Sequence, residues 1–210
     1  MFPLRLLRTA RRVLPAKSLS TSGQLTDLTV DNEGIATLTL QRAPVNSLNV
    51  ELLQELTTVL GQVEKDKAKG LVLTSASPSV FSAGLDITEM YNPNVERLTA
   101  LWTSLQDLWA KLYSAPYPTA VAINIGLIDE TATDKADAIE KSKKFIKRFD
   151  KISPIAHSLT KQRFRSDVLQ RFAKNREADL NQFKYVVLQP EVQELLGQII
   201  QKLKQKKAAK

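Results

Sequence analysis

The feature that most limits the fold is an alternation of β-type and helical apolar patterns over the first 124 residues. Leu28 and Val30 alternate with polar residues before the segment DNEG (31–34), and Leu38 and Leu40 alternate after it. Two alternating runs joined by a short polar turn containing glycine are typical of a β-hairpin. The chain is therefore predicted to begin its folded part with two antiparallel strands.

Two helical stretches and two further β-type runs follow the hairpin. A helix capped by Asn49 is predicted to run to about residue 63, and the apolar run GLVLTS (70–75) is predicted to be a buried strand. A helix over about 94–114 carries both tryptophans on its apolar side, and TAVAIN (119–124) is a further β-type run. This order favours an α/β fold in which helices cover a largely parallel sheet.

From about residue 133 onward every pattern is helical. Thr133 is predicted to cap a first helix, and Ser153 with Pro154 to start a second one that ends near residue 174. A third helix is expected over 176–188, and Pro190 is expected to start the last one. The second half is therefore predicted to be an all-helical region.

The net charge of +8 is concentrated at the two ends of the chain. Residues 1–26 hold five basic residues and no acid, and residues 201–210 hold five lysines and no acid. The body between them is close to neutral, with 20 basic and 22 acidic residues. A nucleic-acid binder would carry its basic residues across a folded face with aromatics among them, so no nucleic-acid partner is expected.

The first residues, MFPLRLLRTARRVLPAKSLSTSG, have the composition of a mitochondrial targeting segment. They are rich in arginine, lack acids and end in serine and threonine, whereas a secretory signal would have an unbroken apolar centre. A disordered basic tail is the alternative. We predict a transit peptide at 1–24 and a location in the mitochondrial matrix; no membrane span and, without cysteine, no thiolate metal site are expected.

The segment VFSAGLDITEM (80–90) follows the predicted strand 70–75 and leads into what is predicted to be a helix, with Asp86 and Glu89 in its first turns. A backbone N–H presented after Gly84 suits an oxygen that becomes negative during a reaction, such as the carbonyl oxygen of a thioester that forms an enolate. On spacing alone, Gly84 could equally serve only to turn the chain.

Three motifs together carry a resemblance to a known family. RAPVNSL (42–48), VFSAGLDITEM (80–90) and VAIN (121–124) occur in this order between the predicted strands and helices. In this respect the chain resembles the crotonase, or enoyl-CoA hydratase/isomerase, family, and most of all its isomerases. The resemblance implies an enzyme of fatty-acid β-oxidation that shifts a 3-enoyl-CoA double bond to the 2-trans position through a thioester enolate. It also implies a CoA thioester as substrate, no cofactor, no metal and a homo-oligomer, a trimer in the family.

The resemblance assigns roles to particular residues. The backbone N–H of Leu85 would be one donor to the enolate oxygen, which makes Leu85 the one catalytic residue expected. Two segments of the CoA site are expected to consist of Ala43, Pro44 and Val45 on one side and of Ala83, Gly84, Leu85, Asp86 and Ile87 on the other. For Asp86 a structural role, as a negative charge at the start of a helix, is favoured over catalysis.

After Asn124 the resemblance jumps to a later part of the family. The next phrase, IGLIDE (125–130), resembles a segment well beyond the glutamate that moves the proton, so the sequence predicts an internal deletion, a missing general base and a missing second oxyanion donor. Asp129 and Glu130 are the remaining candidates for a base, with surface solvation as the favoured interpretation, and the single His157 is expected to be structural.

The expected architecture is thus a truncated crotonase-like fold. Residues 25–132 would be its first part, a hairpin followed by parallel ββα-type units, and 133–210 its C-terminal helical region. The predicted function is that of the isomerase with little or no activity, and the alternative is a non-catalytic form that binds acyl-CoA weakly or associates with full-length subunits. A basic helical adaptor whose tails bind acidic surfaces is a third, less favoured hypothesis.

Overall fold

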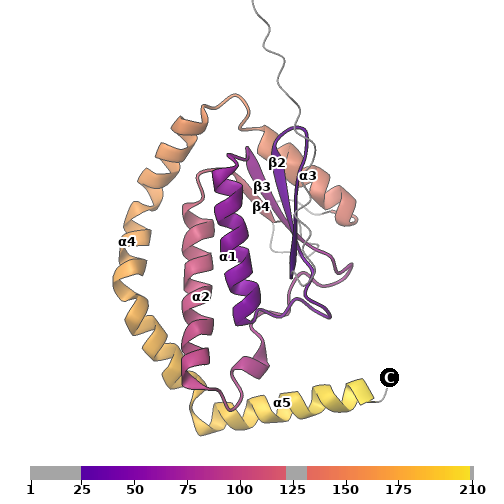
Figure 1. Cartoon of the computed structure of the whole chain (residues 1–210), viewed down its shortest axis with the longest axis vertical. Coiled ribbons are helices and arrows are strands. Elements are labelled where there is room, and N and C mark those ends of the chain that lie inside the picture. The colour runs from indigo at the N-terminus through magenta and orange to yellow at the C-terminus, as the bar shows by residue number, and fades with distance from the viewer. Residues whose placement is uncertain (1–24, 122–131, 209–210) are drawn as a thin grey trace, which may run out of the picture.

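The structure is a computed structural model of the chain and describes residues 25–121 and 132–208. A four-stranded sheet in the order β1-β2-β3-β4 forms its centre, and helices lie on both faces (Figure 1). The strands are β1 (Thr26–Val30), β2 (Ile35–Leu40), β3 (Gly70–Ser75) and β4 (Thr119–Val121). The helices are α1 (Val50–Lys65), α2 (Val95–Ser114), α3 (Lys135–Lys147), α4 (Pro154–Val187) and α5 (Pro190–Ala208), with a short 3₁₀ turn, η1 (Ile87–Glu89), before α2.

The pairing of the strands confirms the predicted hairpin and parallel sheet. β1 pairs with β2 in antiparallel register, with Leu28 opposite Leu38. β2 pairs with β3, and β3 with β4, in parallel. Within the described residues β4 ends the sheet, and Val121 on it is 45% exposed.

Helices α1 and α2 cover one face of the sheet and enclose the main core. Asn49 caps α1 as predicted, because its side-chain oxygen accepts the N–H of Leu52 at 3.1 Å. Fully buried leucines of both helices, among them Leu53 and Leu101, pack with sheet residues such as Leu38. The two proline residues after Ser114 end α2 close to the predicted position.

Helix α3 packs on the opposite face of the sheet. Successive residues of a strand point to opposite faces, so Leu71 belongs to the main core while Val72 packs with Ile35 and Ile146 beneath α3. The approach is close: a Cβ on Gly70 would lie 2.4 Å from Cγ2 of Ile146, so position 70 has no room for a side chain. This close contact sets the distance of α3 from the sheet.

The described structure corrects three details of the sequence-based expectations. Asp134, and not Thr133, caps α3; its side chain accepts the N–H of Asp137 at 2.9 Å. The helices expected to end near residue 174 and to restart at 176 form one continuous α4, and Ser153 makes no side-chain capping hydrogen bond there. No glycine or proline lies in α4 after its first residue, so nothing in the sequence interrupts the helix.

Helix α4 curves along the outer side of α2, with contacts from Arg165 at Tyr113 to Phe183 at Trp102 (Figure 1). The ring of Phe183 stacks on Trp102 with centroids 3.9 Å apart, and Asp179 accepts the indole N–H of Trp102 at 2.7 Å. Helix α5 begins at Pro190 as predicted and leaves this corner at a wide angle. Among the described residues, none of the helices has both the length and the apolar character needed to cross a membrane.

Candidate CoA-binding and oxyanion site

Two loops that are about forty residues apart in the sequence are hydrogen-bonded side by side at the C-terminal end of β3. The Ala83 N–H donates to the Val45 carbonyl at 2.9 Å, and the Leu48 N–H donates to the Gly84 carbonyl at 2.8 Å. The Asp86 N–H donates back to Leu48 at 3.0 Å. The two segments that sequence analysis assigned to the CoA site, 43–45 and 83–87, are therefore neighbours in the structure.

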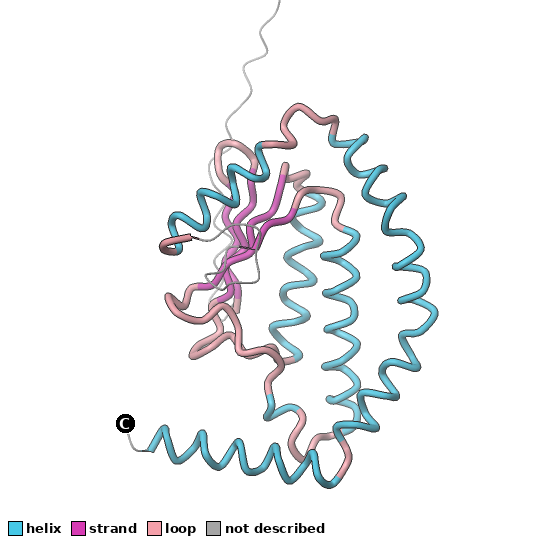
Figure 2. Tube along the Cα trace, turned by 180° about the vertical axis from the view of Figure 1, so that it is seen from behind, coloured by secondary structure: helices cyan, strands magenta, loops and turns pink. Residues whose placement is uncertain are grey.

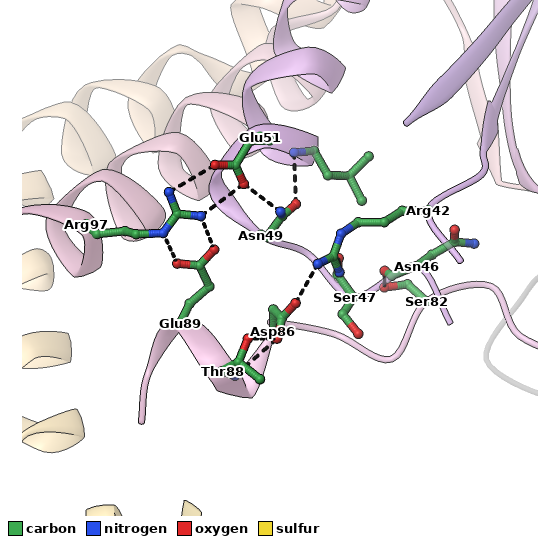
Figure 3. A network of polar contacts seen from close by, with 11 residues as sticks. Arg42, Asn46, Ser47, Asn49, Glu51, Ser82, Asp86, Thr88, Glu89 and Arg97 are labelled. Carbon is green, nitrogen blue, oxygen red and sulfur yellow. Dashed lines mark hydrogen bonds and ion pairs between the residues drawn. The ribbon is translucent and has the colours of Figure 1, made fainter. Parts of the chain in front are cut away.

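Asn46 fixes the first loop from below. Its side chain is only 3% exposed and donates to the Ser75 hydroxyl at 2.8 Å and to the Phe81 carbonyl at 2.9 Å. The Ser82 hydroxyl in turn donates to the Asn46 carbonyl at 2.7 Å (Figure 3). Asn46 has a φ of 51°, a left-handed conformation that asparagine tolerates better than most residues. One amide thus ties the first loop to both the end of β3 and the second loop.

Gly84 and Leu85 form the part of the second loop predicted to meet the thioester. Gly84 has a φ of 81° and open space on the side where a Cβ would stand, so conformation and not crowding calls for glycine. The Gly84 N–H is already engaged within the loop, because it donates to the Ser82 hydroxyl at 3.1 Å. The Leu85 N–H, in contrast, donates to no acceptor among the described residues, although its neighbours on both sides are bonded.

Asp86 has the structural role that sequence analysis favoured. Its carboxylate caps η1 by accepting the Thr88 N–H at 3.1 Å, and it pairs with Arg42 at 2.8 Å (Figure 3). Burial by itself would raise the pKa of Asp86, but the hydrogen bonds from Thr88 and the Arg42 guanidinium outweigh it and lower the pKa. A carboxylate held ionised in this way is a weak proton acceptor.

The helix expected to begin near Asp86 is only the three-residue turn η1. Asn92 has a φ of 44° and Pro93 follows it, so the chain cannot continue as a helix and α2 starts only at Val95. Asp86 and Glu89 therefore flank a short turn and do not lie in the first turns of a long helix.

A second ion-pair cluster lies beside the loops and was not found by sequence reasoning. Arg97 of α2 binds Glu89 of η1 through two hydrogen bonds of 2.5 Å and pairs with Glu51 of α1 at 2.9 Å (Figure 3). The hydrogen bond from Arg97 lowers the pKa of Glu51. The three residues come from three separate elements, and no local spacing in the sequence connects them.

The predicted contact residues differ in their exposure. Ala43, Pro44, Ala83 and Gly84 are exposed, while Val45, Leu85 and Ile87 are half-buried. The two loops thus present an open surface above an ordered base. Within the described residues, no group of three or more acidic or histidine side chains is arranged to hold a metal ion.

Of the other predicted candidates, only His157 lies among the described residues. Asp129, Glu130 and Asn124 lie outside them, as does the predicted transit segment 1–24. His157 is packed against the ring of Phe149, with its Nδ1 3.2 Å from the Pro116 carbonyl oxygen. Its position supports the expected structural role.

A cavity of about 640 Å³ is found at the other end of the sheet. It is bordered by Lys69, just before β3, and by Pro118, just before β4, whereas the loop 80–87 follows the far end of β3. His157 and apolar residues of the α3–α4 connection also line it. This cavity is therefore separate from the candidate CoA site.

Comparison with known proteins shows what this chain resembles. The family description "Enoyl-CoA hydratase/isomerase" matches residues 30–125, the segment that contains both loops. Over this segment the chain is similar to the enoyl-CoA hydratase/isomerase family, and the predicted resemblance and the crotonase-like fold are confirmed.

Among the most similar relatives are mitochondrial enoyl-CoA delta isomerases 1. The mouse protein is 44% identical over 92 residues, which are 43% of this chain and only 32% of the mouse protein, so this match spans about a third of that relative. The rat protein is 26% identical over 247 residues, covering 83% of this chain and 85% of the relative. That alignment is longer than the 210-residue chain, so part of the rat protein has no counterpart here.

Among solved structures, the crystal structure of human mitochondrial delta3-delta2-enoyl-CoA isomerase is similar with a TM-score of 0.81 and 24% sequence identity. The match covers 88% of this chain and 100% of that chain. It establishes a shared fold.

Proposed function

We propose that this chain binds the CoA thioester of an unsaturated fatty acid and belongs to the Δ3,Δ2-enoyl-CoA isomerase branch of its family. The observation that carries the proposal is the paired loops with the unengaged Leu85 N–H between bonded neighbours. Loop residues 43–45 and 83–87 would contact the CoA moiety. The names of the similar relatives support the isomerase branch.

The proposed chemistry is a proton transfer along the acyl chain. Loss of a proton from C2 of a 3-enoyl thioester gives a dienolate, and return of the proton at C4 leaves the double bond between C2 and C3. The negative charge develops on the thioester oxygen, where the Leu85 N–H would donate a hydrogen bond. One such donor is typically worth about 2.7–4 kcal/mol of transition-state stabilisation. The reaction requires no cofactor beyond the CoA thioester.

The described carboxylates near Leu85 are poor candidates for moving that proton. Asp86 is paired with Arg42, and Glu51 is paired with Arg97; both pairings lower the pKa of the carboxyl group. A base must reach the proton and accept it, and a carboxylate held by a guanidinium is less basic. We therefore propose that turnover is far below that of a complete family member, lower by roughly 10² to 10⁴ for the missing base alone.

The test separates binding from turnover. Titration calorimetry with CoA should show weak binding, and absorbance growth on conjugation of 3-enoyl-CoA should show only background turnover. Leu85→Pro removes the proposed donor and should abolish that background while CoA binding persists. Ser79→Pro is the matched control, since Ser79 lies exposed in the same loop and its N–H has no acceptor among the described residues.

The proposal fails if no heat of CoA binding is detected at millimolar concentrations. Turnover close to that of a complete isomerase would contradict the proposed loss of activity, and Asp129 and Glu130 would then be the first residues to replace.

A non-catalytic role is the second candidate, favoured by the ion-paired carboxylates. In that case the chain would bind acyl-CoA weakly or associate with full-length subunits. It could also associate with itself, since the family resemblance implies a trimer. Light scattering of the protein alone and mixed with a full-length isomerase tests association, because a mass equal to the single chain in the first sample, and no mixed complex in the second, would contradict it.

We also propose import into the mitochondrial matrix, guided by residues 1–24. The acid-free, arginine-rich composition and the relatives named mitochondrial support it. A fusion of residues 1–30 to a fluorescent protein should locate to mitochondria, and a cytosolic or secretory distribution would contradict the proposal.

A further inference from the structure

The cavity at the α3–α4 connection is walled by several separate parts of the chain. It is lined by the end of α1 and the turn after it, the segment between α2 and β4, the end of α3 with the residues that follow, and the first turns of α4. Figure 2 shows this connection passing the end of the sheet at which β3 and β4 begin. The cavity volume of about 640 Å³ lies within the roughly 300–1,000 Å³ of small-molecule sites. The hollow is therefore part of the tertiary structure and has the size of a ligand site.

Much of the cavity wall is apolar, and part of this apolar surface is uncovered. Pro118 and Ile146 are buried, whereas three aliphatic side chains of the same wall are 46%, 72% and 60% exposed. These three are Ile152, Ile155 and Leu159. Exposed aliphatic side chains gathered around one hollow mark a binding surface more strongly than single exposed residues do. A molecule that filled the hollow would remove apolar surface from water, so the wall favours a mainly apolar ligand.

Tyr117 supplies a polar group to this cavity. The residue is only 6% exposed, and its hydroxyl makes no hydrogen bond with any residue that the structure describes. Among the described residues no fully buried side-chain oxygen or nitrogen lacks a partner, so the Tyr117 oxygen is not fully buried. Because Tyr117 lines the cavity, the oxygen is open to that space. A ligand oxygen in the cavity would be a partner for this hydroxyl.

The charges around the hydroxyl disfavour a negatively charged ligand. Burial and, after it, the negative charge of Glu64 raise the pKa of Tyr117 to about 12, so the hydroxyl stays a hydrogen-bond donor at neutral pH. Glu64 is paired with Lys111 but still acts on Tyr117, and it would repel a carboxylate bound at the hydroxyl. The acidic and the lysine side chains of the lining are equal in number; they are Glu64, Asp150, Lys67 and Lys69. A neutral acceptor such as a carbonyl oxygen therefore fits better than an anion.

We propose that this cavity binds a neutral, mainly aliphatic carbonyl compound whose oxygen accepts a hydrogen bond from the Tyr117 hydroxyl. A medium-chain ketone represents this class of ligand. The site is distinct from the candidate CoA site, because the cavity lies where β3 and β4 begin and Leu85 follows the other end of β3. Binding here does not depend on the proposed isomerase chemistry, so the two proposals can fail separately.

The test uses the full chain and the fluorescence of Nile red, a neutral apolar dye that carries a carbonyl group. The dye should bind, and 2-undecanone should displace it at lower concentration than undecanoate. These two competitors have the same number of carbon atoms, but undecanoate is negatively charged at neutral pH. Saturating CoA should leave the dye in place, since CoA is expected at the opposite end of the sheet.

Three variants locate the binding site. Tyr117→Phe removes only the hydroxyl and should weaken the binding of 2-undecanone roughly threefold to tenfold, as expected for one hydrogen bond. Ser158→Phe puts a ring into the cavity wall and should lower the affinity for Nile red severalfold. Thr160→Phe is the matched control, because Thr160 is exposed on the same helix but does not line the cavity, and it should bind like the parent. Circular dichroism checks that each variant keeps its helix content.

The proposal is overturned if Nile red does not bind, or if Ser158→Phe binds it as the parent does. It is also overturned if Tyr117→Phe binds 2-undecanone as tightly as the parent, since the hydroxyl would then not hold the ligand. Displacement by undecanoate at equal or lower concentration would contradict the preference for a neutral ligand. Release of the dye by CoA would assign the dye to the paired loops, and an equal loss of binding in Thr160→Phe would assign it to the outer surface of α4.

Discussion

The two described regions of this protein differ in how they are held together. Residues 25–121 form a closed α/β unit, in which almost all of the main core is found. Residues 132–208 are helical and contribute few buried side chains; in the 34 residues of α4 only Val187 is buried among the apolar side chains. The first region is thus built around its own core, while the second is attached to it at separate points.

Those attachment points are of different kinds. Ile146 of α3 packs against Gly70, and Lys143 and Lys147 pair with Asp31 and Glu33 in the hairpin turn. Helix α4 is held mainly by side-chain contacts with α2. A helix held by a few exposed contacts can open without loss of the core, so local stability should differ strongly between the regions.

The largest expected effect is in the first region. Leu101→Ala removes a fully buried side chain from α2 and should lower the free energy of unfolding by about 2–5 kcal/mol, as measured by urea denaturation. Phe164→Ala on α4, at 81% exposure, should change it by less than about 0.5 kcal/mol. Similar losses for both variants would show that α4 shares the core.

An intermediate effect should be confined to the attachment of α4. Trp102→Ala removes the stack on Phe183 and the hydrogen bond to Asp179, which together are worth about 1–3 kcal/mol. Hydrogen exchange should become faster in α4 near those two residues while the amides of α1 stay protected. Faster exchange throughout α1 would mean that the two regions open together, which would contradict the expected difference in their local stability.

The smallest expected effect is the contribution of Asp86, in the paired loops, to the free energy of unfolding, and this contribution depends on pH. The pKa of Asp86 is lowered from its ordinary 3.8, so its contribution to stability is present above pH 3.8 and is lost as the pH falls through the lower value of the folded state. Asp86→Asn should cost about 1 kcal/mol at neutral pH and nothing at the acid end. A cost that is independent of pH would assign the loss to packing and not to the charge.

Sequence reasoning succeeded where the determining interactions are local. The β-hairpin, the Asn49 cap and α2 depend on alternation, capping and helical spacing within a few residues, and all three are found. The chain position of Gly84 likewise predicted a turn, which its φ of 81° confirms.

Sequence reasoning failed where a feature depends on contacts between distant residues, or where a break in a helix was expected without a residue to cause it. The Arg97 cluster joins three elements that only the fold brings together. The break expected near residue 175 had no glycine or proline to cause it. The helix expected after Asp86 is only the turn Ile87–Glu89, and Pro93 follows shortly after it. The pairing of the two loops was predicted from the family resemblance and not from residue spacing. Backbone hydrogen bonds between loops leave no pattern in the side chains from which the pairing could be predicted.

The location of the core also has a consequence for the order of events during synthesis. Beyond residue 121, Val187 is the only described buried side chain that belongs to the main core, so that core is nearly complete once β4 has been made. At about 5–20 residues per second, the ribosome needs roughly 5–20 s more to finish the chain. The sheet with α1 and α2 can therefore close while the last helices are still being translated, and their later docking would add to a unit that has already folded.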